Sequence, residues 1–128
     1  MVNINNQSVQ VDLNVKAGAT YTAIFTVKDS PSVVKDITGW SAQMQVRAAI
    51  GAPSALLTFT STPAAGLTID GANGTITLVI NPSDTNGIST YVGGRIMAYD
   101  LEIDNGVGVR YAPFEGSFIL HPQVTITE

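Results

Sequence analysis

The chain has 128 residues, of which 45% are apolar and only 12% are charged, and it carries a formal net charge of −4 without any cysteine. This composition excludes a disordered chain, a basic nucleic-acid-binding surface and all thiol chemistry, including disulfides and thiolate metal sites. An acidic protein also binds anionic membranes poorly, so we expect neither nucleic acid nor a membrane as a partner.

No segment has the roughly 18 consecutive apolar residues of a membrane-spanning helix, or the charged and then apolar start of a secretory leader. Because the chain has no cysteine, we expect it to fold in a cytoplasm without oxidation, and its length fits one domain over residues 1–128. Its surface must be built largely from Thr, Ser, Asn, Gln and Gly. Such a thinly charged surface is typical of β-rich proteins and of the centre of protein interfaces.

Apolar and polar residues alternate with a period of two along most of the chain, which predicts β-strands rather than helices. In chain order, the predicted strands are SVQVDLNV, TYTAIFTV, WSAQMQVR, ALLTFT, TITLVI, RIMAYDLEI, VGVRYA and SFILHPQVTIT. Asn73-Gly74 and Asn105-Gly106 predict hairpin turns, because both residue types tolerate positive φ. One helical turn is expected near residues 82–86. About eight short strands at this spacing predict an all-β fold, a single antiparallel β-sandwich.

The only tryptophan, Trp40, begins the alternating segment WSAQMQVR, with Ala42 and Val46 on the same side. We expect Trp40 to point inward, since a tryptophan on a central strand buries on the order of 200 Å². Its replacement by alanine is then expected to cost about 3 to 5 kcal/mol, and a ligand-stacking role is the alternative. The predicted core anchors are Trp40, Met44, Phe25 and Tyr99. The Tyr99 hydroxyl either bonds a backbone group or the residue simply fills the core.

Candidate catalytic and metal-binding residues are few. Asp100 and Glu102 share one face of a predicted strand, but no nucleophile accompanies them, so we interpret them as a solvated face. His121 stands alone, and one histidine without cysteine builds no zinc site. Three aspartates beside turns lack EF-hand spacing, which leaves calcium as a minor alternative: Asp70, Asp84 and Asp104. We therefore expect no catalytic residue, no metal, no cofactor and no enzymatic activity.

Five segments together resemble a known family: DITGWSAQMQVR, GTITLVI, YDLEI, VRYAPFEGSFIL and PQVT. They are similar to the immunoglobulin-like N-terminal domain of phage baseplate upper proteins and their free-standing relatives, over about residues 13–126. The resemblance implies an immunoglobulin-like sandwich that docks onto other phage virion proteins, as a tail or baseplate component or as a capsid decoration. It also implies location in the virion after synthesis in the host cytoplasm.

The first residues, MVNINNQ, are polar β-type sequence, which frays at the end of an isolated domain. We expect residues 1–8 to form an extended arm that pairs with the sheet edge of a neighbouring subunit. The predicted contact residues are Val2, Asn3, Ile4, Asn5 and Asn6. A small sandwich of this kind is expected to form a homo-oligomer, either a trimer on a head or a ring on a tail.

The second hypothesis is a carbohydrate- or receptor-binding sandwich, which needs aromatic side chains exposed to a ligand. The candidate ligand-facing aromatics are Tyr91, Tyr111 and Phe114, of which Tyr91 and Phe114 lie in loop-like segments. Exposure of these three side chains is the observation that favours this hypothesis over docking.

Overall fold

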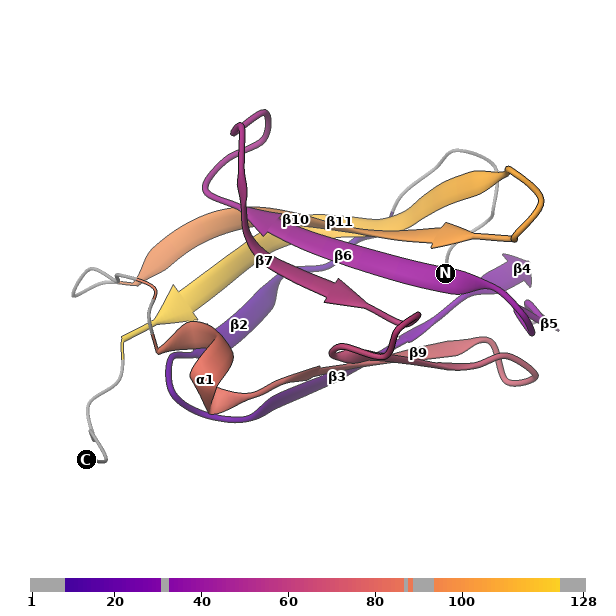
Figure 1. Cartoon of the computed structure of the whole chain (residues 1–128), viewed down its shortest axis with the longest axis horizontal. Coiled ribbons are helices and arrows are strands. Elements are labelled where there is room, and N and C mark those ends of the chain that lie inside the picture. Colours follow the sequence, from indigo (N-terminus) through magenta and orange to yellow (C-terminus); the bar gives the residue numbers. More distant parts are fainter. Residues whose placement is uncertain (1–8, 31–32, 87, 89–93, 123–128) are drawn as a thin grey trace.

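The computed structural model of the chain describes residues 9–30, 33–86, 88 and 94–122, and strands dominate this part (Figure 1). The first elements are β1 (Val9–Gln10), β2 (Leu13–Lys16), β3 (Tyr21–Thr26), β4 (Lys28–Ser30), β5 (Val33–Val34) and β6 (Ser41–Arg47). They are followed by β7 (Ala55–Thr60), β8 (Leu67–Asp70), β9 (Thr75–Ile80), the helix α1 (Pro82–Thr85), β10 (Arg95–Asp104) and β11 (Arg110–His121). Eight of the strands have four residues or more, but they are not the eight that were predicted. Strand β8 was not predicted, and VGVRYA and SFILHPQVTIT were predicted as two strands where the structure has the single strand β11.

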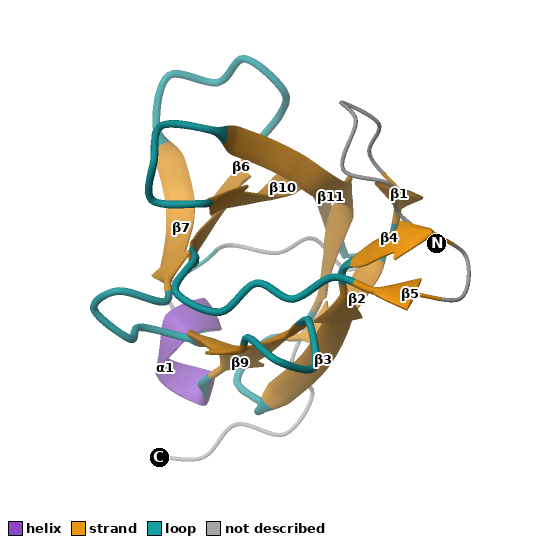
Figure 2. Ribbon diagram, turned by 90° about the vertical axis from the view of Figure 1, so that its right-hand side faces the viewer, coloured by secondary structure: helices purple, strands orange, loops and turns teal. Residues whose placement is uncertain are grey.

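The strands form two facing sheets. The large sheet has the order β1–β11–β10–β6–β7, with β2 also paired to β11, and the small sheet has the order β3–β9–β8. Figure 2 shows β6, β10 and β11 on one side of the molecule and β3 and β9 on the other. This strand order is that of an immunoglobulin-like sandwich, so the predicted fold class is confirmed. One detail differs, because β1 and β2 run parallel to β11 and the large sheet is therefore mixed.

The core lies between the sheets and follows from the alternation of each strand. Met44 of β6 lies opposite Leu101 of β10, and all side chains of this inward row are buried. From the small sheet, the Phe25 ring lies 4.9 Å from the Phe114 ring, measured between centroids. The largest fully buried side chains are Phe118, Ile37, Met44, Leu67, Ile76, Leu78, Ile80, Leu101, Ile103, Leu120 and Val15. Of the predicted anchors, Met44, Phe25 and Tyr99 lie in this core.

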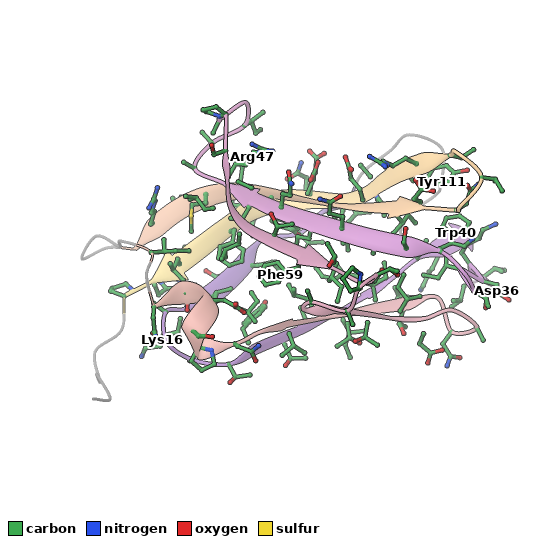
Figure 3. The ribbon with its side chains drawn as sticks, viewed as in Figure 1. Lys16, Asp36, Trp40, Arg47, Phe59 and Tyr111 are labelled. Carbon is green, nitrogen blue, oxygen red and sulfur yellow. The ribbon has the colours of Figure 1, made fainter. Side chains whose placement is uncertain are left out.

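Trp40 occupies a different place from the one predicted. It precedes β6 instead of lying within it, and its side chain is only half-buried, packed against the margin of the core. Its ring stacks on Tyr111, with centroids 5.8 Å apart and planes 13° apart. Figure 3 shows both rings at the same end of the sandwich. The turn at Thr38-Gly39 ends directly before Trp40, so Trp40 lies just before the start of β6 and not in its middle.

The predicted helical turn is present as α1, between β9 and β10. The Asp84 carboxylate accepts a hydrogen bond of 2.8 Å from the Asn81 backbone N–H, which closes the first turn of the helix. The buried Thr85 hydroxyl oxygen accepts a bond of 2.9 Å from the Gly18 N–H. This contact fastens the connection between β2 and β3 to the helix.

Both predicted Asn-Gly turns also form, Asn73-Gly74 between β8 and β9 and Asn105-Gly106 between β10 and β11. The two glycines have positive φ, 65° at Gly74 and 84° at Gly106, a region that favours glycine. Their surroundings differ. A Cβ atom at Gly74 would lie 2.4 Å from the Lys35 carbonyl oxygen, whereas none of the described atoms lies within 4 Å of a Cβ at Gly106.

Candidate functional site

A polar hollow of about 680 Å³ covers the outer face of the large sheet. Side chains from β1, β6, β10 and β11 form its floor, and the loop between β6 and β7 forms one wall. Figure 1 shows this loop standing away from the sheet. The polar side chains that line the hollow are Gln10, Gln43, Gln45, Arg47, Asp100, Glu102, Arg110, Glu115 and Ser117. Five of these side chains are ionisable: Arg47, Asp100, Glu102, Arg110 and Glu115.

Two carboxylates that line the hollow lie at paired positions of adjacent strands. Asp100 on β10 is the register partner of Glu115 on β11. Partial burial, together with the negative charge of Glu115, raises the pKa of Asp100, while the positive charge of Arg47 opposes that rise. Glu115 in turn accepts a hydrogen bond of 2.9 Å from the Gln10 side-chain amide. The pair therefore consists of like charges held together by the sheet, a repulsive arrangement at neutral pH.

Arg47 connects the sheet to the wall of the hollow. Its guanidinium donates one hydrogen bond of 2.8 Å to the Ala52 carbonyl oxygen and another of 2.8 Å to the Gln45 side-chain oxygen. Figure 3 shows Arg47 at the base of the projecting loop. Arg47 thus has two effects. Its hydrogen bond to Ala52 holds the loop in place, and its positive charge reduces the repulsion between Asp100 and Glu115.

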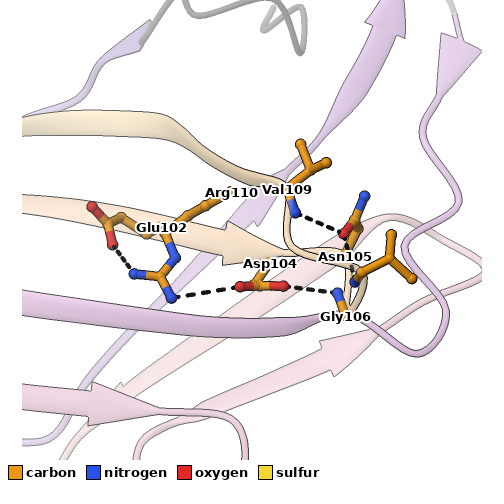
Figure 4. A network of polar contacts seen from close by, with 7 residues as sticks. Glu102, Asp104, Asn105, Gly106, Val109 and Arg110 are labelled. Carbon is orange, nitrogen blue, oxygen red and sulfur yellow. Dashed lines mark hydrogen bonds and ion pairs between the residues drawn. The ribbon is translucent and has the colours of Figure 1, made fainter.

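A second charged group lies toward the β10–β11 turn, where Arg110 reaches two carboxylates (Figure 4). Its guanidinium nitrogens lie 3.8 Å from a Glu102 carboxylate oxygen and 3.5 Å from an Asp104 oxygen. The Asp104 carboxylate also accepts a hydrogen bond of 2.7 Å from the Gly106 N–H, and the Asn105 side-chain oxygen accepts one of 2.9 Å from the Val107 N–H. These contacts stabilise a turn and engage both carboxylates.

The two carboxylates singled out from the sequence have different partners in the fold. Asp100 and Glu102 share the outer face of β10 as predicted, but Asp100 faces Glu115 while Glu102 lies beside Arg110. In the described part of the chain, no three His, Cys, Asp or Glu side chains are grouped closely enough to hold a metal ion. His121 is exposed at the end of β11, where its Nε2 lies 3.0 Å from the Asn14 side-chain oxygen.

Of the three predicted ligand-facing aromatics, the two in the described residues pack against other aromatic rings. Phe114 is buried in β11 and packs on Phe25, so the loop-like interpretation of its segment is wrong. Tyr111 is half-buried and stacks on Trp40, and the Lys35 ammonium lies 5.8 Å from the centre of the Trp40 ring. Tyr91 and the predicted contact residues Val2, Asn3, Ile4, Asn5 and Asn6 lie outside the described residues.

The surface also exposes large apolar side chains that the alternation did not single out as functional. They lie on both sheets, on the β4–β5 hairpin and in two loops: Ile24, Val33, Val34, Ile50, Leu56, Ile96, Val107 and Val109. Ile50 in the loop between β6 and β7 is 94% exposed, and Val107 in the β10–β11 turn is 82% exposed.

No family model and no curated protein matches this chain. Among solved structures, the chain is similar to extracellular domains 3–5 of Drosophila OTK, with a TM-score of 0.35 and 16% sequence identity. That alignment covers 94% of this chain and 35% of the OTK chain. The order of strands in the two sheets defines the class of the protein, an immunoglobulin-like β-sandwich. In the described residues, none of the helical structure has the length and apolar character needed to cross a bilayer.

Proposed function

We propose that this chain is a structural protein of a bacteriophage virion that acts by docking onto other virion subunits and onto copies of itself. The observation that carries the proposal is the set of exposed apolar side chains, from Ile24 on β3 to Val109 before β11, on a chain with only 12% charged residues. A surface that is both poorly charged and apolar in its loops suits a protein that neighbours cover.

The sequence resemblance to phage baseplate upper proteins is the reason for proposing a phage virion as the place where the chain docks. The segments that carry the resemblance contain all of β6 and β9, residues 99–103 of β10 and most of β11. These strands build most of the large sheet and the centre of the small one, so the resemblance concerns the scaffold. The docking surfaces lie in the loops and edges around it, and these select the partner.

We further propose that the chain has no catalytic activity. Several polar groups of the hollow are already engaged with one another, as in the contacts of Arg47 with Gln45 and of Gln10 with Glu115. A nucleophile hydrogen-bonded to an oriented base is the arrangement expected of an active site. Asp100 instead lies opposite a second carboxylate, Glu115, and not beside a nucleophile.

A second candidate is a carbohydrate-binding module, because the hollow has the size of a small-ligand site and is lined by amide and carboxylate groups. A glycan array with the wild-type protein and with Gln45→Ala and Glu115→Gln variants tests this function. Binding that both substitutions weaken supports it. The absence of binding to any glycan favours docking.

Electron cryo-microscopy of virions tests the main proposal directly. Particles of a phage that encodes this chain are compared with particles from which its coding sequence has been deleted. We expect density for the sandwich on the head or the tail of the parent virion, and loss of that density in the deletion. Virions of identical structure and protein content would contradict a virion role while leaving the fold unaffected.

A further inference from the structure

The β3 strand forms an open edge of the small sheet. It is paired along its whole length with β9 on one side, and among the described residues no strand pairs with its other side. In the immunoglobulin constant-type arrangement, the first strand of the domain occupies this position. Here the first strands, β1 and β2, pair with β11 in the large sheet. Among the described residues, no strand therefore occupies the position beside β3.

The backbone groups of β3 that face the open side are identified by the alternation of an antiparallel ladder. The Val27 N–H donates a hydrogen bond of 2.8 Å to the Gly74 carbonyl oxygen, toward β9. Phe25 and Ala23, two and four positions earlier, also direct their backbone N–H and C=O groups toward β9. The N–H and C=O groups of the residues between and beside them, Thr22, Ile24 and Thr26, therefore point to the open edge. The pairing partner of Thr22 gives the same result. Val79 of β9 directs its N–H toward β8, where it donates to the Gly66 carbonyl oxygen, so Val79 and Thr22 do not bond each other.

This edge lacks the features by which proteins usually prevent strand addition. Such features are lysine, proline, inward charges, β-bulges and very short strands. Residues 17–27 contain no charged residue and no proline, and the pairing of β3 with β9 has no shift of register. Ile24, at the middle of the strand, is 66% exposed. The edge is therefore regular, neutral and apolar at its centre.

The other described edges are less suited to strand addition. The pairing of β7 with β6 is shifted between Val46 and Arg47, and Thr60 of β7 already exchanges hydrogen bonds with Ala65. Strand β8 has four residues and ends at Asp70. At the opposite edge of the large sheet, β1 and β2 are interrupted between residues 10 and 13. The β3 edge is the longest regular edge in the described part of the chain.

We propose that the open edge of β3 binds the same edge of a second copy of this chain, antiparallel, across a two-fold axis at Ile24. In this register Ile24 lies opposite Ile24 of the second copy, and Thr22 lies opposite Thr26 of the second copy. The three outward-facing residues of each strand then exchange both of their backbone hydrogen bonds. The two small sheets become one continuous sheet through the dimer.

The chemistry of the edge favours a second copy over an unrelated strand. A two-fold contact places the same surface on both subunits, so the surface must be complementary to itself. An apolar side chain on the axis contacts its equivalent, and the threonine pairs on either side form favourable cross-strand neighbours. No like charges oppose each other, although each copy has a net charge of −4. This contact does not depend on the virion proposal, and it gives a dimer rather than the trimer or ring expected from the sequence.

Sedimentation equilibrium of the full chain with Ile24 variants tests the contact. For the wild type, we expect the average mass to rise from the monomer value of 13.4 kDa toward twice that value between about 1 μM and about 1 mM. Ile24→Lys and Ile24→Glu each place two like charges on the two-fold axis and should remain monomeric. An equimolar mixture of the two variants should dimerise, because the opposite charges then meet at the axis.

A matched control is Ile96→Lys, since Ile96 is 70% exposed on β10, a strand paired on both sides. This variant should dimerise like the wild type, and circular dichroism establishes that all variants are folded. A wild type that stays monomeric throughout overturns the proposal. So does a dimer that survives Ile24→Lys, or a mixture of the two charged variants that fails to associate. The last result indicates a different occupant of the edge, such as residues 1–8 of a neighbour.

Discussion

The Tyr99 hydroxyl donates a hydrogen bond of 2.6 Å to the Val11 carbonyl oxygen, which joins the middle of β10 to the segment between β1 and β2. Burial, with a smaller effect from the Asp12 charge, raises the pKa of Tyr99, so the hydroxyl remains a donor at neutral pH. The sequence left two interpretations of Tyr99 open, and the structure combines them. The ring lies in the core and the hydroxyl bonds the backbone.

Tyr99→Phe should therefore destabilise the fold by about 1 to 2 kcal/mol, because it leaves a partly buried carbonyl oxygen without its donor. Urea unfolding monitored by circular dichroism measures this loss. Tyr111→Phe is the control, since no hydrogen bond joins its hydroxyl to a described residue, and its cost should stay below about 0.5 kcal/mol. Equal costs for the two substitutions would mean that the Tyr99–Val11 bond contributes nothing.

Trp40→Ala should cost about 2 kcal/mol, less than the void left by a fully buried tryptophan. The lower figure follows from the half-buried position of Trp40 and from its contact with Tyr111 at a centroid distance of 5.8 Å. A double-mutant cycle with Tyr111→Ala isolates the stacking contribution, which should be about 0.5 to 1.5 kcal/mol. Strictly additive effects of the two substitutions would show that the stacked rings do not interact.

Asp100→Asn should increase stability at neutral pH by a few tenths to about 1 kcal/mol, since the carboxylate is partly exposed and screened. Burial and Glu115 raise the pKa of Asp100 in the folded state. At a pH between the pKa of Asp100 in the unfolded state and its higher pKa in the folded state, the folded protein binds more protons than the unfolded one. The free energy of unfolding of the wild type therefore falls as pH rises through the folded pKa. Well below the ordinary Asp pKa of about 3.9 both states are protonated, so the gain of the variant should shrink toward zero as pH falls through that value.

Urea midpoints of the wild type and of Asp100→Asn, measured between about pH 3.5 and pH 7, test this dependence. Glu102→Gln provides the comparison, because that substitution removes only an exposed pair at 3.8 Å from Arg110 and should change stability by less than about 0.5 kcal/mol. A constant difference between Asp100→Asn and the wild type across the range would exclude electrostatic repulsion as its cause.

The two Asn-Gly turns allow conformational strain to be separated from steric overlap. Gly106→Ala should cost about 1 kcal/mol, the penalty of placing a Cβ at positive φ. Gly74→Ala should cost more, about 2 to 3 kcal/mol, because its Cβ also meets the Lys35 carbonyl oxygen at 2.4 Å. Thermal unfolding of both variants gives the comparison, and equal melting temperatures would contradict the overlap at Gly74.

The alternation of side chains was sufficient to predict the fold, because each strand with one buried face has a period of two. It predicted the inward rows of β6 and β10 and the Asn-Gly turns correctly. It could not predict where along a strand the facing sheet ends, and Trp40 was therefore placed in the core instead of at its margin. Phe114 was misplaced because Pro113 and Gly116 nearby suggest a loop, although β11 continues through both residues.

The polar hollow was not predictable, because its residues come from separate strands that meet only through pairing. Asp100 and Glu115 become neighbours because β10 and β11 are adjacent and in this register. Gln10 lies beside Glu115 because β1 pairs in parallel with β11, and no local sequence pattern predicts that pairing. The register shift between Leu101 and Ile103 changes the alignment further along the same hairpin.

The central claim is that the chain acts through surfaces covered by other subunits, first of all the edge of β3. Amide hydrogen exchange measured by NMR, at monomeric and at associating concentrations, tests it residue by residue. The amides of Thr22, Ile24 and Thr26 should exchange freely in the monomer and become protected on association, while those of Ala23 and Phe25, which face β9, should change little. Protection that never appears on these three amides, or that appears on a different edge, would contradict the account.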